Sequence, residues 1–228
     1  MNNELSLEIT SIEQHKISLN IKKNIYLLIK RLFDIIVGFV GCLILIPVYI
    51  LIRILYLITK DNHRIIYKQV RIGKNGKKFY LYKFRTMIPN ADKYLKKLLK
   101  ENKKLAKEYR QNHKFEKDPR ITKIGNLLRK SSLDELPQFV NILKGDMSLI
   151  GPRPLVKGEL DKHRGNRKIY ESVRPGLTGW WACNGRSNLS YKERLNLEYY
   201  YVKHQGFIID IKCIFKTIVA ILKKNGAQ

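Results

Sequence analysis

The sequence is poor in acidic residues and in cysteine, and each shortage excludes a class of protein. The 228-residue chain has 19 Asp and Glu residues against 45 Lys and Arg residues, which gives a formal net charge of +26. Such an excess predicts an anionic partner, which can be nucleic acid, a phosphorylated substrate or an anionic membrane surface. The three cysteines are isolated and form no C-x-x-C pair, so neither a zinc site nor a disulfide framework is indicated. A reducing, cytoplasmic environment fits this pattern.

No cleavable signal peptide, internal repeat or low-complexity linker is visible in the sequence. The basic residues are spread along the chain and form no disordered basic tail of the kind that binds nucleic acid. The length favours one main domain with enough residues for a core. Residues 1–19 are polar and mixed in charge, and we expect them to form a loose arm.

A long apolar run follows this arm. Residues 21–32 place apolar side chains at helical spacing beside lysines, which predicts an amphipathic helix entering a membrane interface. Residues 35–52 are uncharged and apolar, and 54–58 extend the run past Arg53. The run is therefore long enough for a transmembrane helix.

Three features of this run oppose a simple span. Pro47 would kink the helix, and Arg53 is costly deep in lipid unless it reaches the surface. Lys and Arg residues flank the run on both sides, whereas such residues prefer the cytoplasmic side. A helix–break–helix hairpin that returns to the same face satisfies both flanks. Proline also occurs in ordinary spanning helices, so a spanning helix stays open, and a buried helix of a soluble protein is a third alternative.

Two β-rich segments come next, at 65–70 and 79–84. Asn75-Gly76 lies between them and is a strong hairpin signal, so we predict a β-hairpin. Lys83 and Arg85 lie together at the end of its second strand. They are either site residues or a solvated basic edge.

Three helices are predicted beyond the hairpin. Residues 90–111 form a lysine-rich amphipathic pattern that suits a membrane surface or a solvated packing helix. Residues 121–130 carry apolar side chains at helical spacing and end in Arg129-Lys130, and Arg129 is close enough to Asp134 to place a cation beside it. Residues 208–222 form an amphipathic helix that we expect to close the fold.

The stretch Ser131-Ser132-Leu133-Asp134-Glu135-Leu136-Pro137-Gln138 places two adjacent carboxylates before a proline. Proline suits the first helical position, so a short helix is predicted from near Pro137 to Gly145. A helix N-terminus favours ionised carboxylates, and an ionised Asp can be a nucleophile or a metal ligand. The alternative is a capping box formed by Ser132 and Glu135, although it would place Pro137 at a helical position where it disrupts a backbone bond.

Two later segments present further candidate residues. Arg153 lies between Pro152 and Pro154, which makes a rigid turn that suits bidentate phosphate binding or is simply a structural loop. Trp180 and Trp181 follow a Gly- and Pro-containing loop. They are core residues, interface anchors or a stacking surface for a base.

Taken together, these residues resemble the bacterial sugar transferase family, the monotopic phosphoglycosyl transferases, over roughly 30–222. The shared motifs are Lys30-Arg31-Leu32-Phe33-Asp34, the break at Pro47, Gln69-Val70-Arg71-Ile72-Gly73, Lys83-Phe84-Arg85-Thr86-Met87, Asp118-Pro119-Arg120, Leu128 through Gln138, Gly145 through Pro154, and Pro175-Gly176-Leu177-Thr178-Gly179-Trp180. Each motif is weak alone, but their joint order is very specific. The chain resembles the minimal form of the family.

The resemblance implies transfer of a sugar 1-phosphate from a nucleotide-diphosphate sugar, usually a UDP-sugar, to polyprenyl phosphate such as undecaprenyl phosphate. Asp134 would attack the β-phosphate and carry the phosphosugar covalently, and Asp134 and Glu135 would hold Mg²⁺, or Mn²⁺ in its place. The diphosphate, nucleotide or lipid phosphate would be bound by the basic residues Lys83, Arg85, Arg129, Arg153 and Arg186. Such a reaction would be an early membrane step of surface polysaccharide, exopolysaccharide or capsule assembly.

Two positions depart from the family pattern. Glu198 replaces the usual Asp before the C-terminal tyrosines, so its role as a further metal ligand is an open alternative. Trp181-Ala182-Cys183-Asn184 replaces the usual Gln-Val-x-Gly, which bears on the choice of nucleotide or sugar.

We therefore expect a mixed α/β, mostly helical fold with a re-entrant helix hairpin, a β-hairpin and amphipathic interface helices around a compact catalytic domain. The expected units are the arm at 1–19, the entry helix and re-entrant hairpin at 20–60, of which about 31–59 dips into the inner leaflet, and the catalytic domain at 61–228 on the cytoplasmic face. No nucleic-acid partner is expected. The rival hypothesis is a non-enzymatic basic adaptor that binds anionic lipid or nucleic acid at the membrane surface.

Overall fold

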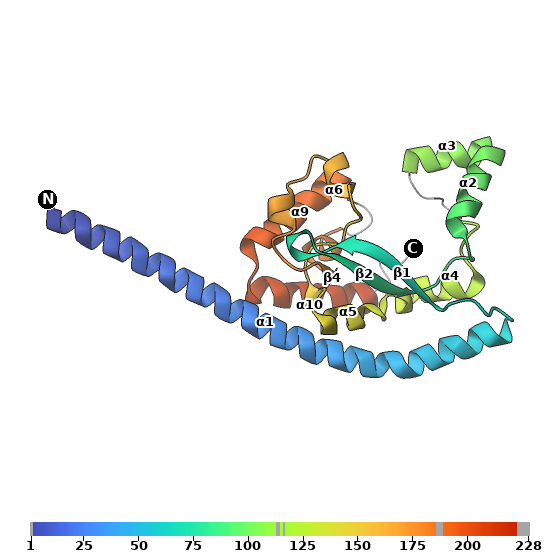
Figure 1. Cartoon of the computed structure of the whole chain (residues 1–228), viewed down its shortest axis with the longest axis horizontal. Coiled ribbons are helices and arrows are strands. Elements are labelled where there is room, and N and C mark those ends of the chain that lie inside the picture. Colours follow the sequence, from blue (N-terminus) through green and yellow to red (C-terminus); the bar gives the residue numbers. More distant parts are fainter. Residues whose placement is uncertain (1, 113–114, 116, 186–188, 223–228) are drawn as a thin grey trace.

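The computed structural model describes residues 2–112, 115, 117–185 and 189–222, and most of them are helical (Figure 1). The elements are α1 (Asn2–Ile58), β1 (Ile66–Ile72), η1 (Lys74–Gly76), β2 (Lys78–Phe84), α2 (Ala91–Glu101), α3 (Lys103–Asn112), α4 (Lys123–Lys130), η2 (Leu133–Glu135), α5 (Gln138–Lys144), β3 (Ser148–Ile150), α6 (Glu159–Lys162), α7 (Arg167–Tyr170), β4 (Gly176–Thr178), α8 (Trp180–Cys183), α9 (Tyr191–His204) and α10 (Phe207–Leu222). The predicted mixed, mostly helical fold with a small β-hairpin is confirmed.

Helix α1 runs along one side of the rest of the chain and extends beyond it at the N-terminal end (Figure 1). It starts at Asn2 rather than after a loose arm, because residues 2–19 contain no Gly or Pro that would end a helix. It also continues through Pro47, so the helix break predicted there is not confirmed. The division of the chain at residues 19 and 60 stays a prediction.

Residues 20–58 of α1 are long and apolar enough to cross a membrane, and no other helix of the described chain meets this test. Most of their apolar side chains are exposed, with Leu28 at 72% and Leu51 at 58% exposed. This exposure disfavours the alternative of a buried core helix in a soluble protein, whose apolar face would be covered.

Both ends of this apolar segment bind the same compact part of the protein. At one end, Lys30 Nζ lies 2.5 Å from Asp210 Oδ2 on α10. At the other end, Asp61 Oδ1 lies 2.9 Å from Arg85 Nη2, just beyond β2. The segment therefore lies alongside the remainder of the chain instead of leading away from it (Figure 1).

Two glycines bring α5 close to α1. A Cβ atom at Gly41 would lie 2.2 Å from Cγ of Phe139, and one at Gly38 would lie 3.1 Å from the backbone nitrogen of Leu143. Such short separations leave no room for a larger side chain at Gly41 unless Phe139 moves. Because glycine has no side chain, Gly38 and Gly41 allow α1 and α5 to pack at this short distance.

Polar side chains of α1 secure the same region. Arg31 donates hydrogen bonds to the carbonyls of Ile142 at 2.7 Å and Leu143 at 2.9 Å, in the last turn of α5. Asp34 is buried and accepts the backbone N–H of Leu149 on β3 at 2.8 Å. These contacts hold α5 and β3 against α1.

The predicted β-hairpin is confirmed. Strands β1 and β2 pair antiparallel, with Tyr67 opposite Lys83. Asn75 and Gly76 both have positive φ angles, of 56° and 73°, as a type I′ turn requires. The alternation of side chains along the strands then places Arg71 and Lys83 on one face of the hairpin.

Two helix predictions need correction. The single helix expected over 90–111 is divided into α2 and α3, because Asn102 leaves helical geometry and its side chain accepts the N–H of Leu105 at 3.0 Å. Helix α10 does close the fold, but through its buried residue Cys213. Ile209 and Ile214 pack beside it, whereas other large apolar side chains of α10 are exposed, with Ile211 at 61% and Phe215 at 72%.

Candidate active site

The two adjacent carboxylates lie in the 3₁₀ turn η2, which connects α4 to α5. Ser132 precedes the turn with a φ of 56° and makes no capping hydrogen bond through its side chain, so the capping-box alternative is not found. Helix α5 begins after Pro137 and ends before Gly145, as predicted. The turn therefore leaves Asp134 and Glu135 available for chemistry at the start of a helix.

Lys83 of β2 and Glu135 form an ion pair, with 2.8 Å between Nζ and Oε1. Burial raises the pKa of the Asp134 carboxyl, Lys83 opposes this shift, and the neighbouring Glu135 carboxylate adds to it. The positive groups around Asp134 therefore do not fully offset the cost of burying its ionised carboxylate. A cation brought in with a phosphorylated substrate would favour its ionised form.

Two further predicted basic residues lie at the end of α4 and just beyond β2. Arg129, in the last turn of α4, donates from Nε to Thr86 Oγ1 at 3.0 Å. Arg85 donates to the backbone carbonyl of Arg64 at 2.8 Å and also pairs with Asp61. Arg85 therefore connects β2 to the segment after α1, while its role in phosphate binding stays a prediction.

Two cavities meet at this point. The larger cavity, of about 700 Å³, is lined by both carboxylates, Arg129 and Arg85. The smaller cavity, of about 430 Å³, is lined by Glu135 and by Arg153. Both cavities are bordered by the same four residues, which are Arg71, Lys83, Ser132 and Glu135.

The surroundings of Arg153 fix its position. Its backbone N–H donates to Glu198 Oε1 at 3.0 Å, and its carbonyl accepts the Tyr170 hydroxyl at 2.8 Å. Its guanidinium pairs with Glu159 at 2.8 Å and borders the smaller cavity. The predicted rigid turn is therefore held by side chains from α7 and α9.

Glu198 is buried at 1% exposure and borders neither cavity that contains the carboxylate turn. Burial raises its pKa to about 7, although the N–H of Arg153 opposes that shift. The structure thus places Glu198 behind Arg153, and its role as a metal ligand stays a prediction. Arg186, also predicted to bind substrate, lies outside the described residues.

Arg71 is a basic residue of the site that sequence reasoning did not select. It borders both cavities, and its buried Nε atom has no hydrogen-bond partner among the described residues. Burial and the nearby charge of Arg153 lower its pKa. The carboxylate of Glu159 lies near both guanidinium groups, at 3.9 Å from Arg71 and 2.8 Å from Arg153. One carboxylate balances only one of the two positive charges, so an anionic ligand would stabilise this pair further. Tyr67 lies opposite Lys83, so Arg71, four residues after Tyr67 on the same strand, shares the face of Lys83. The sequence alone does not give this strand register.

The two tryptophans differ in their surroundings. Trp180 stacks on Tyr200 with 5.9 Å between ring centroids, which makes it a packing residue between α8 and α9. Trp181 borders the smaller cavity, with the guanidinium of Arg194 5.9 Å from its ring centroid. Of the three alternatives for these residues, packing accounts for Trp180, whereas Trp181 faces the site.

The described residues contain no group of three or more His, Cys, Asp or Glu side chains that could hold a metal ion by themselves. Mg²⁺, however, is commonly held by one or two carboxylates together with substrate phosphates and water. Asp134 and Glu135 border one cavity and fit this requirement.

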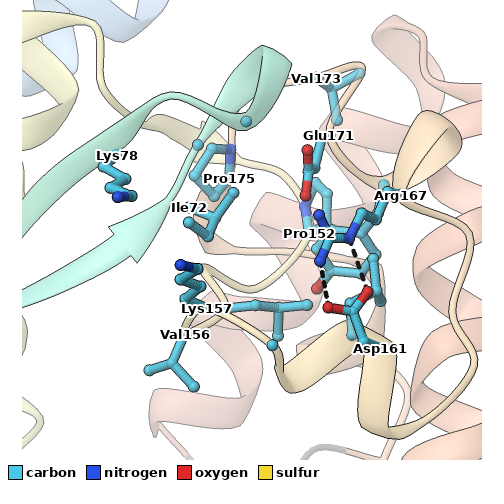
Figure 2. A pocket seen from close by; sticks show the side chains of 16 residues that line it. Ile72, Lys78, Pro152, Val156, Lys157, Asp161, Arg167, Glu171, Val173 and Pro175 are labelled. Carbon is cyan, nitrogen blue, oxygen red and sulfur yellow. Dashed lines mark hydrogen bonds and ion pairs between the residues drawn. The ribbon is translucent and has the colours of Figure 1, made fainter.

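A third cavity, of about 170 Å³, lies beside the hairpin turn. In Figure 2, the ion-paired Asp161 and Arg167 lie on one side of it and Lys78 and Lys157 on the other. None of the predicted site residues that the structure describes borders it. It is therefore separate from the carboxylate turn.

Comparisons with known proteins agree with the resemblance seen in the sequence. A family model described as "Bacterial sugar transferase" matches residues 25–224. The chain is 37% identical over 212 residues to the UDP-galactose-lipid carrier transferase of Erwinia amylovora, covering 93% of this chain and 44% of the relative. It is 40% identical over 212 residues to the undecaprenyl-phosphate galactose phosphotransferase of Salmonella typhimurium, with 93% and 44% covered. It is 40% identical over 198 residues to the exopolysaccharide production protein ExoY of Sinorhizobium fredii, with 87% of each covered. The chain spans less than half the length of the first two relatives.

Proposed function

Because the chain belongs to the bacterial sugar transferase family, we propose that it transfers a sugar 1-phosphate from a nucleoside diphosphate sugar to a polyprenyl phosphate. One observation carries this proposal. A carboxylate turn that contains Asp134 lies where two cavities meet, and Arg71, Lys83 and Arg153 surround that junction. Phosphoryl transfer needs chiefly positioning and charge neutralisation, which this arrangement supplies. The names of the relatives support UDP as the nucleotide and undecaprenyl phosphate as the acceptor.

In the first step, a carboxylate oxygen of Asp134 attacks the β-phosphorus of the donor. The phosphoanhydride bond to the nucleotide breaks, and UMP leaves with the electron pair. The phosphosugar then remains on Asp134 as an acyl phosphate. Arg71 and Lys83 border both cavities and are placed to neutralise phosphate charge during this exchange.

In the second step, a phosphate oxygen of the polyprenyl phosphate attacks the same phosphorus. The acyl phosphate bond breaks, Asp134 is released as a carboxylate, and the product is a polyprenyl diphosphate sugar. A single carboxylate used twice suits substrates that arrive one after the other, one soluble and one in the membrane.

Asp134 and Glu135 would hold Mg²⁺, which, when bound, supplies neutralisation of the developing phosphate charge. Besides neutralising phosphate charge, Lys83 orients Glu135 at the border of the two cavities through its ion pair at 2.8 Å. Arg153 presents a guanidinium from a rigid turn, which suits bidentate binding of a phosphate.

The proposed location is the cytoplasmic face of the cell membrane, with the apolar part of α1 re-entrant. Support comes from the two ends of that segment, since Lys30 and Asp61 both bind the compact part of the chain. A helix that crosses the bilayer would place its ends on opposite sides. The basic residues on both flanks also favour one common, cytoplasmic side.

The proposal is tested by incubating the protein with Mg²⁺ and each member of a panel of nucleotide sugars, without acceptor. The unsubstituted protein should release up to about one equivalent of UMP and retain a phosphosugar adduct visible by mass spectrometry. Asp134→Asn should do neither and still bind donor, because the basic residues remain. Asp161→Asn removes an exposed carboxylate elsewhere and is the matched control, which should behave like the parent.

An adduct on Asp134→Asn, or release that requires the acceptor, would refute the covalent step and leave direct transfer as the mechanism. A chain that releases no nucleotide from any donor, and whose membrane affinity follows charge and falls with salt, would instead support the adaptor hypothesis.

A further inference from the structure

We infer that the two cavities divide the substrates: the smaller one receives the first isoprene units of the polyprenyl phosphate, and the larger one receives the nucleotide sugar. This inference rests on the proposed function and specifies which part of the site each substrate contacts. It is carried by the residue types around each cavity and by the elements that supply them.

The smaller cavity has a largely apolar wall. Its apolar part is formed by Leu81, Leu136, Phe139, Leu149, Leu177, Trp181 and Ala220. The polar residues of the wall, beyond those shared with the larger cavity, are Gln138, Arg153, Thr178 and Thr217. An apolar surface of this kind favours a hydrocarbon chain over a nucleotide or a sugar, whose polar groups would lose hydrogen bonds to water there.

The same cavity lies against the elements of the chain that expose apolar surface. Phe139 borders it and packs directly on Gly41, in the middle of the apolar run of α1. Ala220 borders it from α10, the helix on which Phe215 is 72% and Ile218 is 50% exposed. A lipid chain that comes from the membrane would therefore meet this cavity first.

The larger cavity has a different wall. Polar and charged side chains contribute much of it, among them Gln69, Asn90, Asp92, Lys93 and Arg129. No described residue of α1, α5 or α10 borders it, so it is separated from the exposed apolar surfaces. Its volume of about 700 Å³ lies within the range of cavities that hold nucleotide-sized ligands.

The phosphate groups of both substrates then meet at the shared border. Lys83 and Arg71 line both cavities, and Asp134 lines the larger one beside Glu135. A lipid phosphate held by these cations lies next to the carboxylate turn while its chain stays in the smaller cavity. The donor phosphates reach the same cations from the opposite side.

Two alanines give a matched test, because Ala220 borders the smaller cavity and Ala91 borders the larger one, each from a helix. Ala220→Phe should raise the KM for undecaprenyl phosphate about tenfold and change UMP release without acceptor by less than about twofold. Ala91→Phe should slow UMP release or raise the donor KM about tenfold and leave the acceptor KM within about twofold. Thermal unfolding shows whether each variant is folded. If Ala220→Phe or Ala91→Phe does not fold, the smaller substitution at the same position, Ala220→Leu or Ala91→Leu, is used instead.

Binding is measured separately, so that the test does not depend on catalysis. In a Trp180→Phe variant, Trp181 is the sole tryptophan. Its fluorescence should change when farnesyl phosphate is added to this variant, because Trp181 borders the smaller cavity. Ala220→Phe should weaken this change about tenfold, and Ala91→Phe should not affect it.

Loss of UMP release in Ala220→Phe equal to that in Ala91→Phe would overturn the division. So would an unchanged farnesyl phosphate titration in Ala220→Phe, because the lipid chain would then bind elsewhere. If the parent binds farnesyl phosphate in this way but releases no UMP from any donor, the proposed transfer fails while the lipid cavity stands.

Discussion

Glu198 Oε1 accepts the backbone N–H of Arg153 at 3.0 Å, although 45 residues separate the two along the chain. The Tyr170 hydroxyl donates to the carbonyl of the same residue at 2.8 Å. Both polar backbone groups of Arg153 are thus bound by side chains from other elements, while its guanidinium faces the smaller cavity. The carboxyl group at 198 acts on the site through the backbone it holds.

This arrangement gives a prediction about pH and stability. Because burial raises the pKa of Glu198 from 4.5 to about 7, the folded state binds this proton more tightly than the unfolded state does. The resulting stability is present below about pH 4.5 and is lost as the pH rises through about 7, by up to about 3 kcal/mol. Glu198→Gln should remove this dependence, as measured by urea unfolding in detergent micelles at pH 5 and pH 8.

The comparison between parent and Glu198→Gln isolates this group, because all other titrating groups are shared. Glutamine keeps an oxygen that accepts the N–H of Arg153, so activity at pH 8 should fall little. If the two proteins lose the same stability between pH 5 and pH 8, Glu198 does not titrate in this range.

Activity should depend on the planar, forked shape of the Arg153 guanidinium and not only on its charge. Arg153→Lys should lower kcat/KM nearly as much as Arg153→Ala, by about tenfold or more, if a bidentate contact to phosphate is made there. Arg167→Lys is the control, because that arginine pairs with the exposed Asp161 and borders neither cavity at the carboxylate turn. Full activity of Arg153→Lys would reduce Arg153 to a source of positive charge.

The contact of Gly41 with Phe139 gives a prediction about packing. Gly41→Leu should destabilise the protein by about 1–3 kcal/mol, because its Cβ would lie 2.2 Å from the ring. Combined with Phe139→Ala, the loss should be smaller than the sum of the two single losses by about 0.5–3 kcal/mol. Urea titrations in detergent micelles measure this, with the exposed Val40→Leu as a control that should have little effect. Additive losses would show that the two residues do not share this space.

The two flanks of the apolar segment give a prediction about topology. Single cysteines placed at Lys23 and at Lys60, in a background in which Cys42 and Cys183 are replaced by Ser and Cys213 by Ala, should both react with a membrane-impermeant maleimide only after the cells are opened. This expectation follows from the proposed re-entrant arrangement, which is supported by the contacts of Lys30 and Asp61 with the compact part of the chain. Labelling of either cysteine in intact cells would establish that the segment spans the membrane.

Local signals in the sequence predicted the elements that depend on local chemistry. Asn75-Gly76 gave the hairpin because both residues accept the positive φ of a type I′ turn. Pro137 and Gly145 gave the limits of α5 for equally local reasons. The division of α2 from α3 was missed, because Asn102 is tolerated inside many helices and ends one here through its own side chain.

Local patterns selected Asp134, Glu135, Arg129 and Arg153 as candidates, but their assembly with Lys83 into one site was predictable only from the family resemblance. Lys83 and Glu135 are 52 residues apart, and no periodic pattern connects them. Arg71 enters the site through the register of β1 on β2, which is a property of the folded hairpin. The placement of Glu198 behind Arg153 likewise depends on how α9 packs, so the residue type alone did not distinguish a metal ligand from a group that holds the backbone.

The partners of Asp34 have a consequence for the order of events during synthesis. Its carboxylate binds Ser148 and the N–H of Leu149, which leave the ribosome more than a hundred residues later. The apolar helix is therefore complete while this carboxylate still lacks its partners. If the helix enters the membrane during synthesis, as the proposed location implies, β3 binds to α1 only after that insertion, and folding of the compact part follows it in time.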